Sequence, residues 1–151
     1  YEWNSGKLVA DGSRVRFPVS MTETAAYPGF PTDLQSLLMA VLATIPGKSC
    51  ILESVFEDRF KITGELNRMG ATEGRKAWIR GTSDLQGGYL QAQELRGGAA
   101  LVIAALAARG ESIVEGYSFI CRGYEDIVQD ISDLGGKIKK DTGMTTYEYI
   151  Q

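Results

Sequence analysis

The sequence predicts an α/β (α+β) protein built from a helix–strand–helix unit that occurs twice. Apolar positions with helical spacing recur about 61 residues apart, at Leu34, Val41, Leu42 and Ile45 and then at Leu95, Val102, Ile103 and Leu106. The strand-like segments SCILESVF and SIVEGYSF begin at Ser49 and Ser112, about 63 residues apart, and each is followed by an arginine, Arg59 or Arg122. A second helical pattern, over residues 62–70, returns after about 65 residues at 127–135.

Such a unit cannot bury its apolar face alone, so its copies must pack on one another. We therefore expect functional side chains at the seam between the two units, with the repeated arginines as candidates. The chain begins with Tyr1 rather than Met, and two units would leave a flank of each sheet uncovered. We therefore expect further chain, upstream by preference.

The first unit is expected to span about residues 27–85. Two prolines stiffen its first loop because they fix φ, and Thr32 or Asp33 is positioned to cap the helix that follows. In order, we expect an edge strand over 15–19, the stiff loop over 27–31, a helix ending before Pro46, a strand over 49–56, a helix closed by Gly70, and a half-buried strand over 76–80 with Gly81 as the turn.

The second unit is expected to span about residues 86–140. Its helix carries Gly97 and Gly98 near its start, which is unusual because glycine disfavours helix interiors. In order, we expect a strand over 89–92, a helix over 94–109, a strand from Ser112 and a further helix starting at Gly123. The tail, 141–151, has no clear period and receives no assignment.

Charge and hydropathy exclude two kinds of partner. The net charge is −3 and the 16 Lys and Arg residues are scattered without a basic stripe, so we expect no nucleic-acid partner. No apolar run approaches the ~20 residues of a membrane helix, and no signal peptide opens the chain. We therefore expect a cytoplasmic protein with no membrane partner.

The chain has no histidine, and so it lacks the commonest general base and metal ligand. Cys50 and Cys121 lie in apolar, strand-like surroundings, where reduced core thiols are expected rather than a disulfide. Two cysteines in unrelated contexts do not build a metal site. We expect neither a metal nor another cofactor.

Arg96 fits its local structure worst, because the dipole of a helix disfavours a cation in the first turn. With Gly97 and Gly98 beside it, the position suits an anion that approaches the backbone at the helix start. Equally, Glu94 could neutralise Arg96 while the glycines allow close packing of the helix on the sheet. The sequence leaves both interpretations open.

Arg122 and Asp33 complete the candidate site. Arg122 lies between a strand and an expected helix start, where a guanidinium and backbone donors can converge on phosphate or carboxylate, although a solvated surface arginine fits as well. Asp33 is either a helix N-cap or a carboxylate that faces the two arginines and moves a proton.

Five motifs carry a family resemblance: YPGFPTDLQS from Tyr27, VFEDRF from Val55, ELNRMGA from Glu65, ELRGGAALVIAALAARG from Glu94 and RGYEDI from Arg122. They look like the C-terminal part of bacterial UDP-N-acetylglucosamine 1-carboxyvinyltransferase, an enolpyruvyl transferase. The motifs run in the family's order from about Val9 to Lys140, so the resemblance covers most of the chain.

The resemblance implies an inside-out α/β barrel of the enolpyruvyl transferase type, with about two of its repeated units present. It implies transfer of the enolpyruvyl group of phosphoenolpyruvate to the 3-hydroxyl of UDP-N-acetylglucosamine with release of phosphate, the first committed step of peptidoglycan synthesis. It also implies a tetrahedral intermediate and no metal. The expected partners are these two substrates and the remainder of the same enzyme upstream, without which this chain would be inactive.

The motifs assign roles to individual residues by resemblance. Asp33 matches the aspartate that contacts the sugar hydroxyl and transfers a proton, and Arg96 and Arg122 match the arginines that bind the phosphate and carboxylate of phosphoenolpyruvate. The further substrate-binding positions are Val55 and Arg59 on the UDP-sugar, Glu94 in place of an acidic residue that is usually Asp, and the adjacent Leu95.

Two departures from the family pattern leave alternatives open. Ile62 stands where the family usually has histidine, and Cys121 replaces the carboxylate that usually precedes Arg122. A divergent, non-catalytic paralogue that binds a nucleotide sugar or a protein partner therefore remains an alternative. The related shikimate-pathway enolpyruvyl transferase is a third, but it lacks the FPTDLQ and RGYE motifs.

Overall fold

The computed structural model describes residues 2–4, 6–9, 11–13, 17–57, 59–69, 76–141 and 148–150. In chain order, the elements are β1 (Glu2–Asn4), β2 (Lys7–Val9), β3 (Thr22–Glu23), the 3₁₀ helix η1 (Thr32–Leu34), α1 (Gln35–Ala43), β4 (Gly47–Leu52), α2 (Thr63–Arg68), β5 (Lys76–Gly81), β6 (Tyr89–Gln91), α3 (Leu95–Ala107), β7 (Ser112–Glu115), α4 (Tyr117–Ile120), α5 (Ile127–Asp133), β8 (Ile138–Lys140) and β9 (Glu148–Ile150).

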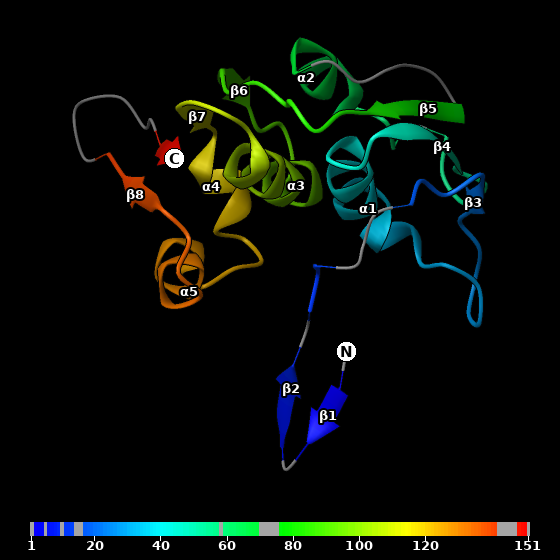
Figure 1. Cartoon of the computed structure of the whole chain (residues 1–151), viewed down its shortest axis with the longest axis horizontal. Helices are drawn as coiled ribbons and strands as arrows, with labels where there is room; N and C mark the ends of the chain where they lie inside the picture. The colour runs from blue at the N-terminus through cyan, green and yellow to red at the C-terminus, as the bar shows by residue number, and fades with distance from the viewer. Residues whose placement is uncertain are drawn as a thin grey trace.

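Two small sheets enclose a pair of central helices. One sheet has the order β3-β4-β5 and the other β6-β7-β9-β8, while β1 and β2 form a separate antiparallel hairpin. Helices α1 and α3 pack against each other, α1 also packs on β4 and β5, and α3 packs on β7 and β9. Figure 1 shows this arrangement, with the hairpin lying apart from the central helices. The helices are therefore inside and the sheets outside.

The two units repeat their hydrogen bonds as well as their sequence. In the first, the Val19 N–H donates to Ser49 Oγ (3.0 Å) and the Val19 carbonyl accepts from Cys50 N–H (3.2 Å). In the second, the Gly88 N–H donates to Ser112 Oγ (3.4 Å) and its carbonyl accepts from Ile113 N–H (2.9 Å). Both serines are buried, and in each unit the buried hydroxyl finds a backbone partner, as buried polar groups require.

Small residues let the central helices approach their neighbours closely. Helix α3 is buried along most of its length. Apart from Leu101 and Val102, its buried residues are all Gly or Ala. A Cβ on Gly98 would lie 2.6 Å from Ile120 Cγ1 and 3.0 Å from Ala92 Cβ, so no side chain fits there. At Gly98, the glycine is explained by close packing of α3 on α4 and on the end of β6.

A buried carboxylate connects the units at their seam. Glu65 of α2 is only 8% exposed, and its Oε2 accepts the N–H of Gln91 at the end of β6 (3.1 Å). Arg68 contacts the same oxygen at 3.4 Å. Because a buried carboxylate is stable only when it is hydrogen-bonded or paired, this contact ties α2 of the first unit to the sheet of the second.

Several expected element boundaries were wrong, for identifiable reasons. The strand from residue 49 ends at Leu52 rather than 56 because the Glu53 carboxylate binds the following N–H groups and turns the chain. The strand from Ser112 ends at Glu115, where Gly116 adopts a left-handed φ of 86° and α4 begins.

Gly81 is not a turn but the last residue of β5, paired with Gly47. A Cβ at Gly81 would overlap the carbonyl oxygens of Ile45 and Leu42, so glycine permits close approach of the strand to the end of α1. The expected alternation of burial along β5 is confirmed.

The expected edge strand at 15–19 is only partly described. Residues 15 and 16 lie outside the described residues, and 17–19 belong to no strand. Gly70, expected to close α2, also lies outside them; α2 ends at Arg68 with Met69 as its C-cap. Part of the unassigned tail forms β9, which pairs with β7 and β8.

Both cysteines are free thiols, as expected, but only one is in the core. Cys50 is buried and Cys121 is exposed. The expectation of a core position was wrong for Cys121 because it follows α4 on the surface rather than lying in a strand.

Candidate active site at the seam between the units

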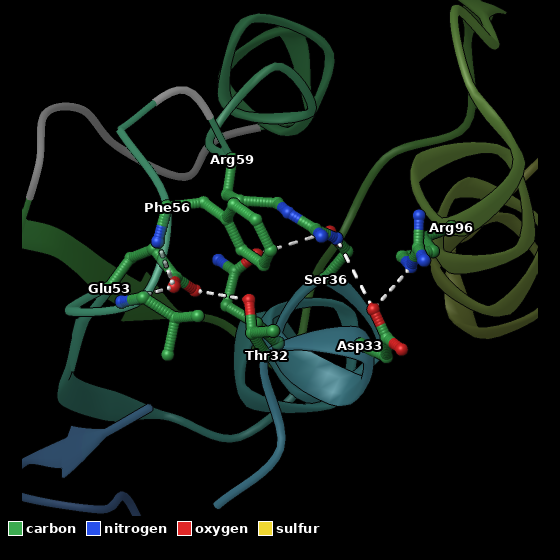
Figure 2. A network of polar contacts seen from close by, with 9 residues as sticks. Thr32, Asp33, Ser36, Glu53, Phe56, Arg59 and Arg96 are labelled. Carbon is green, nitrogen blue, oxygen red and sulfur yellow. Dashed lines mark hydrogen bonds and ion pairs between the residues drawn. The ribbon is translucent and has the colours of Figure 1, made fainter. Parts of the chain in front are cut away.

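Asp33 lies in η1, directly after the proline-containing loop, and its carboxylate faces both units. Its Oδ1 accepts from Arg96 Nε at 2.8 Å and from Arg59 Nη1 at 3.4 Å. The expected capping role was wrong: the N-cap of η1 is Pro31, that of α1 is Leu34, and neither helix start has a side-chain cap. The carboxylate is therefore turned toward the arginines, as Figure 2 shows.

Arg96 occupies the first turn of α3, as expected, and pairs across the seam. Its partner is Asp33 of the first unit rather than Glu94, its near neighbour in sequence. The side chain of Arg96 remains 37% exposed, and that of Asp33 62% exposed. Both groups are therefore accessible to a ligand while they hold each other in place.

Arg59 is held more firmly than Arg96. Its side chain is 16% exposed and its guanidinium lies over the Phe56 ring, 4.2 Å from the ring centre. A cation over an aromatic face gains roughly 0.5–1 kcal/mol at exposed sites and more when desolvated. Phe56 and Asp33 thus contact the same guanidinium (Figure 2).

Glu53 organises the loop that leads to Arg59. Its Oε1 accepts from the N–H groups of Val55 (3.0 Å) and Phe56 (3.1 Å), and its Oε2 accepts from the Thr32 hydroxyl (2.8 Å). Burial by itself raises the pKa of this carboxyl, but hydrogen bonds from Thr32, Thr24 and the Phe56 and Val55 amides outweigh it and hold the pKa below its ordinary value.

Arg122 stands apart from this cluster. It is exposed and makes no ion pair or hydrogen bond with another described residue. The expected helix start at Gly123 was wrong, because α5 begins at Ile127, where the Asp126 carboxylate caps it through the Gln129 N–H (3.0 Å).

Gly123 nevertheless connects Arg122 to the seam. An ideal Cβ on Gly123 would lie 2.7 Å from Leu95 Cδ2. Because Leu95 directly precedes Arg96, the backbone beside Arg122 is packed against the start of α3. Leu95 thereby links the two arginines, which themselves do not touch.

A comparison with family models identifies the fold and the family. The model described as EPSP synthase (3-phosphoshikimate 1-carboxyvinyltransferase) matches residues 3–131, which is most of the chain. This chain belongs to that family. The expected inside-out α/β fold of the enolpyruvyl transferases, with about two of its repeated units, is confirmed.

The curated relatives of this family member agree with the resemblance read from its motifs. It is 50% identical over 119 residues to UDP-N-acetylglucosamine 1-carboxyvinyltransferase of Desulfofundulus thermocisternus, covering 77% of this chain and 49% of that protein. It is 51% identical over 121 residues to UDP-N-acetylglucosamine 1-carboxyvinyltransferase 2 of Carboxydothermus hydrogenoformans, covering 78% and 29% respectively. The chain thus spans half or less of the length of these relatives.

Solved structures of other members share the fold. The enolpyruvyl transferase NikO from Streptomyces tendae superposes with a TM-score of 0.68 at 32% identity, covering 81% of this chain and 29% of that one. An EPSP synthase from Acinetobacter baumannii gives a TM-score of 0.62 at 16% identity, covering 88% and 30%. The second match shows the common fold alone.

The remaining motif positions of this enolpyruvyl transferase homologue fall around the seam. Val55 is 43% exposed on the Glu53 loop, and Glu94 is the N-cap of α3, with its side chain beside Gly97. Ile62, one of the two departures expected from the resemblance, is buried in the core at 3% exposure.

Sequence reasoning missed Glu53, Thr32 and Phe56 as members of the site network. The position of Glu53 could have indicated its role. It directly follows three strand residues of which two are buried, and an acidic residue at such a place needs partners. Across the described residues, no cluster of three or more metal-ligating side chains occurs, and no described helix is long and apolar enough to cross a membrane.

Proposed function

We propose that the protein containing this chain transfers the enolpyruvyl group of phosphoenolpyruvate to the 3-hydroxyl of UDP-N-acetylglucosamine and releases phosphate. The observation that carries the proposal is the Asp33 carboxylate between Arg59 and Arg96, at the seam of a fold shared with enolpyruvyl transferases. The names of relatives at about half identity support the UDP-sugar as acceptor.

In this proposal the arginines and Asp33 have different roles in the reaction. Arg96 and Arg122 bind the phosphate and carboxylate of phosphoenolpyruvate, since a guanidinium matches both groups in bidentate geometry. Asp33 accepts the proton of the sugar hydroxyl as the hydroxyl oxygen bonds to C2 of phosphoenolpyruvate, and C3 takes up a proton as the double bond opens, which gives a tetrahedral intermediate. Loss of phosphate from that intermediate, with loss of a proton, restores the double bond.

The same arrangement gives the Asp33 ion pairs a role. Asp33 pairs with both Arg59 and Arg96, so neither cation is left unpaired and the group of three keeps a net positive charge that suits an anion. A phosphate anion competes with Asp33 for Arg96, and its binding releases the carboxylate to act on the acceptor hydroxyl. Arg59 and Val55 contact the UDP-sugar in this proposal, while Glu94 and Leu95 line the site.

We further propose that this is a cytoplasmic step of peptidoglycan synthesis and that parts of the enzyme outside this chain complete the site. The relatives are at least twice as long as the matched region, which supports the second point. Excluding water from a transferase site requires closure over both substrates. We expect this chain by itself to release no phosphate.

The test is an assay of phosphate release with phosphoenolpyruvate and UDP-N-acetylglucosamine, on the longest natural form of the protein and on this chain alone. Activity of the longer form that requires both substrates supports the proposal, and shikimate 3-phosphate serves as the competing acceptor. Release with shikimate 3-phosphate alone would assign the protein to the other acceptor. No release with either, alongside tight binding of UDP-N-acetylglucosamine, would identify a non-catalytic paralogue.

A further inference from the structure

The Glu53 carboxylate joins two segments that carry site residues. It is 7% exposed, and both of its oxygens are used: Oε2 by the Thr32 hydroxyl, and Oε1 by the N–H groups of Val55 and Phe56. Thr32 immediately precedes Asp33, and the Phe56 ring supports the Arg59 guanidinium. Glu53 itself contacts neither Asp33 nor Arg59 (Figure 2).

Burial and hydrogen bonding fix the position of the Glu53 carboxylate. A buried acceptor with three or more donors has no alternative partner, and removing it leaves those donors unsatisfied. The Val55–Phe56 turn and the Thr32 side chain are therefore held at a set separation. That separation in turn determines where Asp33 and the Arg59 guanidinium lie relative to each other.

The second unit shows that the repeat does not need this carboxylate to turn. The position about 63 residues beyond Glu53 is Gly116, which turns the chain through a left-handed φ of 86° instead. Arg122, the counterpart of Arg59, is exposed and unpaired there among the described residues. The carboxylate is thus associated with the arginine that is held in place, not with the turn as such.

We propose that Glu53 is a positioning residue of the transferase site: through Thr32 it orients Asp33, and through Val55 and Phe56 it orients Arg59. This rests on the proposed function above. The two connections, an Asp33 arm through Thr32 and an Arg59 arm through Val55 and Phe56, serve different tasks: Asp33 moves the proton of the sugar hydroxyl, while Arg59 binds the UDP-sugar. The arms can therefore be separated by mutation.

The experiment compares four variants of the longest natural form of the protein by steady-state kinetics. Thr32→Val cuts only the Asp33 arm, so kcat falls about 10-fold while KM for UDP-N-acetylglucosamine stays within about 2-fold. Glu53→Ala cuts both arms, so kcat falls up to about 100-fold and KM for the UDP-sugar rises. Glu53→Gln keeps an acceptor for the two amides and restores most activity.

Glu23→Gln is the matched control. Glu23 is exposed and accepts from the Ser54 hydroxyl at 2.6 Å, so it touches the same loop from the other side without reaching Thr32 or Phe56. Its kinetic constants should equal those of the unmodified protein. The positioning role would be overturned if Glu23→Gln and Glu53→Ala had equal effects. It would also be overturned if Glu53→Ala lowered the melting temperature without changing kcat or KM.

A second readout separates this inference from the proposed function. The Asp33 carboxyl carbon is followed by NMR, together with amide exchange at Val55 and Phe56. Glu53→Ala should shift the Asp33 resonance and expose both amides, whereas Thr32→Val should shift only the Asp33 resonance. Lack of transferase activity in the unmodified protein would reject the proposed function. The positioning of Asp33 by Glu53 is tested separately, and an unchanged Asp33 resonance in both variants would reject it.

Discussion

The segment after β4 and the segment after β7 occupy the same place in the repeat but are built differently. After β4, Glu53 binds the backbone ahead of it, and the chain reaches Arg59 with its guanidinium on Phe56 and Asp33. After β7, Gly116 turns the chain into α4, and Arg122 projects from its end without a partner among the described residues.

The difference separates a preorganised cation from one that no described residue orients. Arg59 is 16% exposed and already oriented, so binding to it requires little loss of side-chain freedom. In the proposed function Arg122 would have to be ordered by the anion it binds, at a cost of roughly 0.5–1.5 kcal/mol for such a side chain. The two copies of the unit thus carry arginines at matching positions but hold only one of them in place.

The largest expected effect is on turnover, from Asp33→Asn in the longest natural form of the protein. The isosteric change removes the proton acceptor, and we expect kcat to fall by ~10²–10⁴. Melting should be nearly unchanged, because Asp33 caps no helix and its own side chain is 62% exposed. Wild-type turnover would eliminate the catalytic role and leave the two ion pairs as structural contacts.

Removing each arginine tests the contrast between the held and the free cation. Arg96→Ala and Arg122→Ala should each lose roughly 2–5 kcal/mol of transition-state stabilisation, seen in kcat/KM for phosphoenolpyruvate. Arg59→Ala should act mainly on KM for the UDP-sugar. Arg122→Ala should also leave the melting temperature unchanged, and a clear drop would show that Arg122 has a structural partner.

Adjacent glycines in α3 test how the second segment is placed. Gly98→Ala should destabilise the protein by about 1–3 kcal/mol, since the new Cβ meets buried Ile120 of α4. Because α4 leads to Arg122, its displacement should also weaken phosphoenolpyruvate use. Gly97→Ala is the control: its Cβ lies 3.4 Å from the nearest side-chain atoms, and helix propensity should make it neutral or slightly stabilising by urea unfolding.

The smallest effect is on the pH dependence of unfolding. Hydrogen bonds hold the pKa of Glu53 in the folded protein below its ordinary value. Its contribution to stability is therefore fully present above the pKa of the unfolded state and is lost as the pH falls through the folded-state pKa. The difference in unfolding free energy between the unmodified protein and Glu53→Gln should therefore be largest near neutral pH and should shrink as the pH is lowered to about 3. A difference that is constant with pH would contradict the lowered pKa.

Sequence reasoning correctly predicted the two units, the central helices, β5 and the place of Arg96 in the first turn of α3. These depend on local periodicity and on propensity, which the chain displays directly. It misjudged where the strands after Ser49 and Ser112 end and where the helix after Arg122 begins. Those boundaries depend on a side chain binding nearby backbone, at Glu53 and Asp126, and on the left-handed Gly116.

The sequence by itself determined the repeat, the central helices and the family to which the chain belongs. Only the tertiary structure decided that Asp33 faces Arg96 instead of capping a helix, and that Glu53 joins Thr32 to the loop that leads to Arg59. The Asp33–Arg59 contact spans 26 positions of chain and the Thr32–Glu53 contact spans 21. Such contacts follow from how α1 packs on α3 and β4, and no local pattern encodes that packing because it depends on all the side chains between the helices at once.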